Sequence, residues 1–280
     1  MSNFAWDAAI LDLILAVLFA FLLIRIATSS DEYFRKPFYT LFVATGTYNI
    51  LSVISYIPMS HFVYSSDKRV YSAAYGFNTL GVAGSTIGKS IITIHRYIVI
   101  KTAELVENNW STTIVHLLLI LQFGLSAIPA TPIFYRIVEV EPPTYGHEFV
   151  NTYLSKLISK SFAVVMYISY IICNIVFTLL SHRQLNRLPS SMAKKAQRSM
   201  FIITSACSLS HLVKAVYQFT VVITGIFYLE ELYKWMFKIY PLVNGLATYT
   251  APVCLIYFSP KVRERMCFKC SRATVDVYDG

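Results

Sequence analysis

The stretch SFAVVMYISYIICNIVFTLLS, residues 161–181, contains no charged side chain. A helix of about 20 residues rises about 30 Å, which is the thickness of the hydrocarbon core of a bilayer. Other long runs without Asp, Glu, Lys or Arg cover residues 37–60, 70–88, 110–135 and 239–260. Soluble proteins rarely contain even one such run, so the pattern predicts a protein that crosses a membrane several times.

The composition supports this interpretation. Of the 280 residues, 56% are hydrophobic and 14% are charged, whereas soluble domains carry about 25% charged residues. Residues 8–26 and 199–229 are also apolar, apart from two ionisable groups each. We therefore predict an all-α fold in which one membrane domain, residues 1–280, contains seven transmembrane helices and ends in a cytoplasmic tail at 259–280. The predicted spans are 8–27, 37–59, 71–100, 111–134, 158–181, 199–228 and 236–258.

The distribution of Lys and Arg predicts the orientation. Cytoplasmic loops retain positive charge. With the N-terminus outside, fifteen Lys and Arg residues lie in cytoplasmic segments and seven lie outside. Seven acidic residues leave the inner side with a net charge near +8 and the outer side near zero. The positive charge then faces the anionic lipid of the inner leaflet, and it gives no reason to expect a nucleic acid partner.

The segment IGKSIITIHRYIVIK, residues 87–101, ends the third predicted helix and carries Lys89, His95, Arg96 and Tyr97. Ionisable groups are costly inside a membrane, so they face the protein interior or reach the interface. Arg96 lies near the cytoplasmic interface, where it can be a simple anchor whose charged end reaches water. The other interpretation is a functional role, and the residues alone leave both open.

Three features resemble a known family. They are TIHRYIVIKTAELVENNW at residues 93–110, VNGLATYTAPVCLIYFSPKVRERM at 243–266, and the spacing of the seven spans. Together they resemble a seven-helix G-protein-coupled receptor, and more narrowly a nematode serpentine chemoreceptor of the Srg superfamily, classes V and gamma among them. The resemblance implies a small-molecule ligand, a heterotrimeric G protein as partner, and a multi-pass location in the plasma membrane of a sensory neuron.

The resemblance also implies roles for single residues. Arg96 is expected to hold the inactive bundle closed and then to release and receive the G protein, with Tyr97 beside it. His95 departs from the pattern, because large receptor families place Asp or Glu there. A histidine cannot form that ion pair, so the restraint on Arg96 must be weaker or come from elsewhere. A charged His95 would repel Arg96, which gives the hypothesis of a pH switch.

The seventh span and the tail add further candidates. Pro252 removes a backbone donor and predicts a kink, and with Tyr257 it forms a candidate hinge. The segment after Ser259 predicts a short amphipathic helix on anionic lipid. Cys267 and Cys270 are candidates for palmitoylation, with unmodified thiols as the alternative. No further ligands accompany this pair, so we predict neither a metal nor a cofactor.

The ligand site is predicted in the outer half of the bundle. Lys214 is the main candidate for contact with the ligand. The alternative is a buried lysine with a purely structural role. Lys89 lies deeper, where a structural or coupling role fits better than ligand contact. The remaining candidates for ligand contact are polar or aromatic residues near the outer ends of the first, third and sixth spans: Asp12, Tyr75, Asn78, Tyr217 and Gln218.

Other function classes remain as alternatives. We find no enzyme motif such as a phosphate-binding loop or a nucleophile elbow. A transporter would favour inverted repeats and paired carboxylates at the midplane, and the two halves of the sequence show neither. A small-molecule transporter, a ligand-gated channel, and a receptor relative that no longer couples to a G protein are therefore the competing hypotheses.

Overall fold

A computed structural model describes residues 3–62, 68–102, 112–135, 153–186, 191–227 and 229–266. All regular structure in these ranges is helical, which confirms the predicted all-α seven-helix fold. Most helices extend a few residues beyond the predicted spans. The helices are α1 Asn3–Ala27, η1 Glu32–Arg35, α2 Pro37–Phe62, α3 Lys68–Thr102, α4 Thr112–Tyr135, α5 Tyr153–Asn186, α6 Ser191–Ile226, α7 Glu230–Phe258 and α8 Pro260–Met266.

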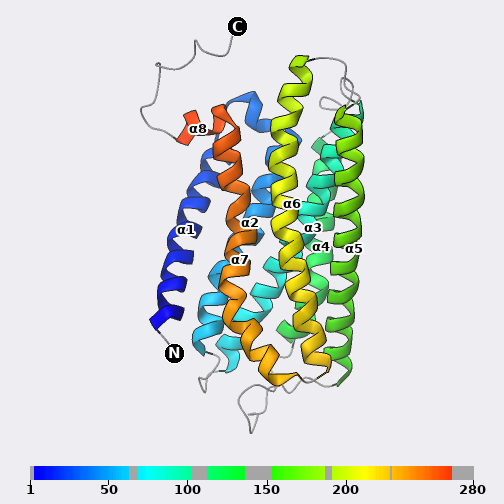
Figure 1. Cartoon of the computed structure of the whole chain (residues 1–280). Helices are drawn as coiled ribbons and strands as arrows, with labels where there is room; N and C mark the ends of the chain where they lie inside the picture. The colour runs from blue at the N-terminus through cyan, green and yellow to red at the C-terminus, as the bar shows by residue number, and fades with distance from the viewer. Residues whose placement is uncertain are drawn as a thin grey trace.

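The seven long helices run side by side along a common direction (Figure 1). Helix α1 begins at one end of the bundle, and the short helix α8 lies at the other end. We call these ends the N-terminal face and the α8 face, and the adjoining halves of the bundle the N-terminal half and the α8 half. Helix α3 is central, because it packs against α2, α4, α5 and α6.

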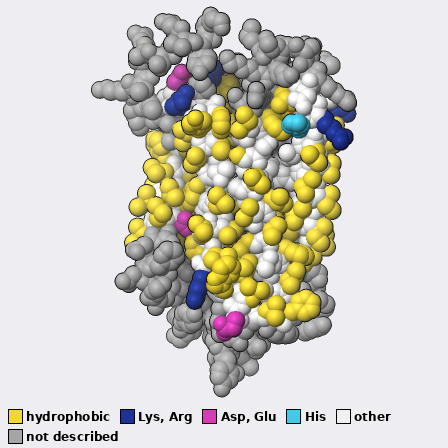
Figure 2. Space-filling model, viewed as in Figure 1, with side chains coloured by type: hydrophobic (Ala, Val, Ile, Leu, Met, Phe, Trp, Pro, Cys, Tyr) yellow, Lys and Arg dark blue, Asp and Glu magenta, His cyan; other side chains and the backbone are white. Residues whose placement is uncertain are grey.

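The outer surface of the bundle is apolar. Figure 2 shows hydrophobic side chains over most of the middle of one face, with most charged side chains toward the two ends. Among the described residues, five helices, α1, α2, α4, α5 and α7, are long and apolar enough to cross a membrane. Helices α3 and α6 are longer still, at 35 and 36 residues. They are less apolar because they carry buried ionisable groups, among them Lys89, Arg96 and Lys214.

Glycines on α3 allow α2 to approach it closely. A Cβ added at Gly81 would lie 2.6 Å from the backbone nitrogen of Ser52, and one at Gly88 would lie 2.2 Å from Oγ1 of Thr45. Only glycine fits at such positions, and close approach through small residues is typical of membrane helices. The α2–α3 pair therefore forms a tightly packed wall along the length of the bundle.

Ser259 separates the last two helices. Its backbone N–H donates to the carbonyl of Leu255 at 3.0 Å, and its carbonyl accepts from the N–H of Arg263 at 3.1 Å. The first of these bonds closes α7 and the second opens α8, with Pro260 at the first helical position, where its missing N–H costs nothing. Pro252 lies inside α7, as predicted.

Candidate functional site

Arg96 lies at the α8 face, in the last turns of α3. Its side chain is 6% exposed, and its guanidinium carbon is 4.1 Å from the centroid of the Phe38 ring on α2. A guanidinium over an aromatic face is attracted by the negative charge of the ring face. His95 is 2% exposed beside it. The contact with Phe38 thus provides a restraint on Arg96 that needs no neighbouring carboxylate.

Phe38 belongs to a larger group of rings, which we call the aromatic cluster: Tyr33, Phe34, Phe38, Tyr39 and Phe42. Tyr39 lies in its middle, with ring centroids 5.1–5.2 Å from those of Phe34, Phe38 and Tyr33. Helix α8 joins the cluster through Lys261, whose Nζ is 4.5 Å from the Tyr33 ring centroid. The start of α2, the end of α3 and α8 are therefore packed as one unit.

Two lysines and a histidine meet in the middle of the bundle. Nζ of Lys89 donates to the carbonyl of Ala247 at 2.9 Å and lies 3.3 Å from Nδ1 of His211. Nζ of Lys214 donates to Oδ1 of Asn244 at 2.6 Å. We call these five residues the lysine layer. It connects α3, α6 and α7 and is almost completely buried, since Lys214 and His211 are each 1% exposed.

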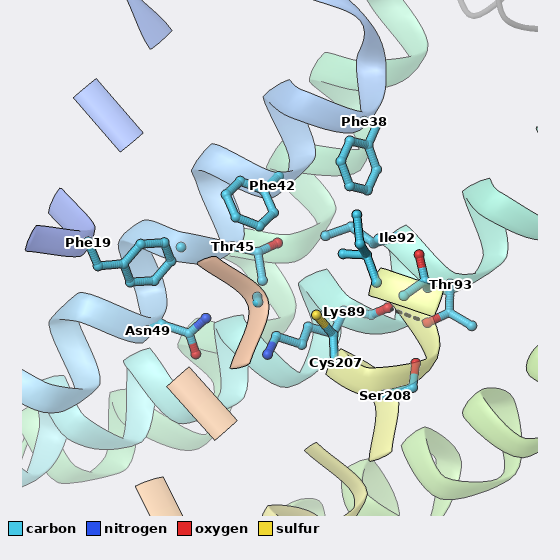
Figure 3. A pocket seen from close by; sticks show the side chains of 14 residues that line it. Phe19, Phe38, Phe42, Thr45, Asn49, Lys89, Ile92, Thr93, Cys207 and Ser208 are labelled. Atoms are coloured by element: carbon cyan, nitrogen blue, oxygen red, sulfur yellow. Dashed lines mark hydrogen bonds between the residues drawn. The ribbon is translucent and has the colours of Figure 1, made fainter. Parts of the chain in front are cut away.

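A small cavity lies between the lysine layer and the aromatic cluster. Its volume is about 30 Å³, which is space for a few atoms rather than for an odorant-sized molecule. In Figure 3, Phe38 and Phe42 lie on one side of it, and Lys89, Asn49 and Cys207 lie on the other. The cavity therefore borders both the α8 half and the middle of the bundle.

The N-terminal half contains a second polar group, which we call the tyrosine cluster: Tyr56, Tyr217, Tyr240 and Asn78. Nδ2 of Asn78 donates to the carbonyl of Ser52 at 2.8 Å and to the hydroxyl of Tyr240 at 3.1 Å. The ring of Tyr240 lies 4.5 Å from that of Tyr56 and 5.8 Å from that of Tyr217. The hydroxyl of Tyr217 donates to the carbonyl of Met236 at 2.6 Å.

The structure brings some of the predicted ligand-site residues together. Asn78 and Tyr217 share the tyrosine cluster, and Lys214 lies in the adjoining lysine layer. Gln218 is only partly buried, and Tyr75 is 37% exposed and stacks on Tyr71 at 6.5 Å. Tyr75 therefore faces outward rather than into the bundle.

Asp12 and Lys214 approach α7 without meeting. A Cβ added at Gly245 would lie 3.3 Å from Oδ1 of Asp12, so the carboxylate lies against α7 beside that glycine. The hydroxyl of Tyr249 donates to the backbone carbonyl of Asp12 at 2.7 Å. Lys214 uses the neighbouring residue, Asn244, and within the described ranges it forms no ion pair with Asp12.

The residues predicted to couple to the G protein do not form one cluster in the structure. Lys89 and Arg96 are buried on one helix, whereas Tyr97 packs its ring 5.4 Å from Phe177 on α5. Tyr257 is 71% exposed and contacts Phe258 at 4.9 Å between ring centroids. It therefore faces the surroundings of the bundle and not Arg96. Cys267 and Cys270 lie outside the described residues.

Sequence reasoning missed Phe38, Asn244 and Tyr240. Asn244 had a visible signal, since an amide within an uncharged span must find a hydrogen-bond partner inside the protein. Phe38 and Tyr240 had none, because the chain contains 19 Phe and 20 Tyr residues. Only the packing of the helices selects which of these rings are buried next to polar groups.

Residues 8–272 match the family described as Serpentine type 7TM GPCR chemoreceptor Srv. The match covers nearly the whole chain, so the chain belongs to this family. It confirms a serpentine chemoreceptor of the seven-helix G-protein-coupled type, while membership of class gamma or of the wider Srg superfamily stays a prediction. No individually curated protein matches the chain.

Proposed function

We propose that this Srv-type chemoreceptor binds a small molecule in the N-terminal half of its bundle and signals through Arg96 at the α8 face. In this proposal the N-terminal face is extracellular and the α8 face is cytoplasmic, in the plasma membrane of a sensory neuron. The family implies a ligand and a heterotrimeric G protein in general terms. The positions of both sites within the bundle are our inference.

The observation that carries the proposal is the contact between Arg96 and Phe38. An arginine and an aromatic ring attract each other by about 0.5–2 kcal/mol, depending on how far they are removed from water. That energy is large enough to favour the resting state and small enough for a ligand to overcome. Because a ligand shifts an equilibrium only by its difference in affinity for the two states, a weak restraint suits a receptor for small molecules.

The lysine layer supports a connection between the two halves. On α7, Asn244 and Ala247 are three residues apart and so lie on one side of the helix. They bind Lys214 of α6 and Lys89 of α3, respectively. A ligand that displaces Tyr217 or Lys214 therefore breaks contacts between α6 and α7 and changes their relative position. We infer that α6 then moves away from α3 at the α8 face and exposes Arg96, with the basic segment 183–198 meeting the G protein.

Heterologous expression with a second-messenger readout tests the function. A panel of small volatile and soluble molecules is applied, and a response is expected that Arg96→Gln abolishes. Tyr257→Phe is the matched control, because Tyr257 faces away from the bundle, and it should respond like the wild type. A ligand-gated current that persists without G proteins would instead identify a channel.

A further inference from the structure

The lysine layer contains two buried lysine side chains, and no described acidic side chain lies within ion-pair distance of either. Lys89 and Lys214 are 6% and 1% exposed, respectively. Within the described ranges neither forms an ion pair, and the acid of the bundle, Asp12, lies against Gly245 instead. Buried charges in membrane proteins normally have a partner of opposite sign. The two lysine side chains on α3 and α6 thus share one buried region, and an ammonium group on either of them has no acidic partner among the described residues.

The present partners of these lysines are neutral. They are the carbonyl of Ala247, the amide oxygen of Asn244 and Nδ1 of His211. When Lys89 is protonated it only donates, so Nδ1 of His211 then accepts and the hydrogen of the neutral imidazole is on Nε2. Neutral acceptors satisfy hydrogen bonds, but they do not cancel the charge.

The cavity next to Lys89 offers room for a counter-ion. Its volume of about 30 Å³ exceeds the 10–15 Å³, roughly, that one water-sized particle requires. An ammonium group has three donors, and Lys89 uses two of them in the contacts with Ala247 and His211. Thr45 also lines the cavity, and its buried hydroxyl, which lies beside Gly88, has no hydrogen-bond partner in the described part of the chain.

We propose that this cavity binds a small, singly charged anion, held by the ammonium group of Lys89 and the hydroxyl of Thr45. A halide ion and the carboxylate group of a very small organic acid share the required chemistry. This site lies between the lysine layer and the aromatic cluster of the α8 half, whereas the tyrosine cluster lies in the N-terminal half. It is therefore separate from the ligand site that we propose above and does not depend on it.

The test measures thermal unfolding of the full-length protein in nanodiscs of zwitterionic lipid. Buffers of equal ionic strength contain chloride, bromide, formate or gluconate. Because an ion that binds only the folded state stabilises it, we expect the melting temperature to be higher in at least one of the small anions than in gluconate, by about 2–4 °C. The difference should disappear in Lys89→Gln and persist in Lys101→Gln, which is at the exposed α8 face.

A second pair of variants keeps the test decisive if Lys89→Gln does not fold. Thr45→Val removes the hydroxyl at nearly constant volume and should raise the anion concentration needed for half of the stabilisation. Thr47→Val is the matched control, since Thr47 is exposed two residues away and bonds its own helix. Equal melting temperatures in all four wild-type buffers, or an unchanged anion response in both Lys89→Gln and Thr45→Val, would overturn the proposal.

The same buffers identify the source of the anion. Stabilisation by chloride and bromide would assign the site to a free halide, and stabilisation by formate alone would assign it to a carboxylate; either result supports the site. The readout needs neither a G protein nor an odorant. Failure of the anion site would therefore leave the proposed receptor function standing, and failure of signalling would leave the anion site standing.

Discussion

At the α8 face a charged group, the guanidinium of Arg96, lies over the Phe38 ring, whereas the tyrosine cluster of the N-terminal half consists of neutral polar groups. Asn78 and Tyr240 form such a neutral pair at 3.1 Å. A small movement of a helix separates a charged group from an aromatic ring. A ligand that enters a network of buried hydrogen bonds must instead replace each bond that it breaks. This difference is the basis of our proposal that the α8 face switches and that the N-terminal half recognises the ligand.

The largest effect is expected at the end that switches. Arg96→Gln should reduce G-protein activation at least about tenfold, equivalent to about 1.4 kcal/mol, because it removes the charge that we propose meets the G protein. Second-messenger accumulation, normalised to receptor at the cell surface, measures it. Lys101→Gln, on the same helix but exposed, should retain most of the signal. Full activity of Arg96→Gln would remove the functional distinction between the two ends.

A substitution in the α2–α3 contact, which runs along the length of the bundle, should destabilise the whole protein. Gly81→Ala places a Cβ 2.6 Å from the backbone of Ser52, and overpacking of this kind costs about 1–3 kcal/mol. Gly124→Ala is the matched control, because nothing lies within 4 Å of its added Cβ. Thermal unfolding in detergent should show a lower melting temperature for the first variant and an equal or higher one for the second. Equal stability of the two variants would show that α2 and α3 are less tightly packed.

A change at the end that recognises should leave resting activity intact. Asn78→Ala removes the donors to Ser52 and Tyr240, and each lost buried hydrogen bond costs about 0.5–1.5 kcal/mol. We expect a shifted concentration response to whichever molecule activates the wild type, with unchanged basal signalling. Tyr75→Phe, at an exposed position on the same helix, should behave like the wild type. Raised basal activity in Asn78→Ala would show that the tyrosine cluster also controls the resting state, which would contradict the proposed division of roles.

The smallest effect is the direct energy of the Arg96–Phe38 contact. A double-mutant cycle with Arg96→Gln and Phe38→Leu, measured by unfolding in nanodiscs, should give a coupling of about 0.5–2 kcal/mol. The cycle with Phe42→Leu in place of Phe38→Leu provides the control, since Phe42 belongs to the same aromatic cluster. If the effects of Arg96→Gln and Phe38→Leu simply add, the contact contributes nothing.

The seven helices could be predicted because the bilayer imposes one rule on every span. Each needs about 20 apolar residues, and the sequence shows these runs directly. The beginning of α6 at Ser191 rather than at residue 199 is the clearest deviation. The segment AKKAQR at residues 193–198 is polar but consists of good helix formers. Hydropathy therefore marks the membrane and does not mark the end of the helix.

The candidate site could be predicted only in part. Lys89, Arg96 and Lys214 were visible as ionisable groups in apolar runs, and all three are buried. Their partners were not visible, because contacts across helices depend on how each helix is rotated about its axis. Tyr75 and Asn78 are three residues apart, yet one faces outward and the other inward. Position along a span was therefore predictable, and direction around the helix was not.

The most direct test of the account is the basal signalling of receptors altered at Phe38. Phe38→Leu removes the aromatic face beneath Arg96 and keeps an apolar side chain, while Phe38→Trp keeps an aromatic face. If the ring restrains Arg96 in the resting state, Phe38→Leu should raise basal second-messenger production about two- to thirtyfold, as expected for a loss of about 0.5–2 kcal/mol, and Phe38→Trp should not. Equal basal activity in Phe38→Leu and the wild type would contradict the account.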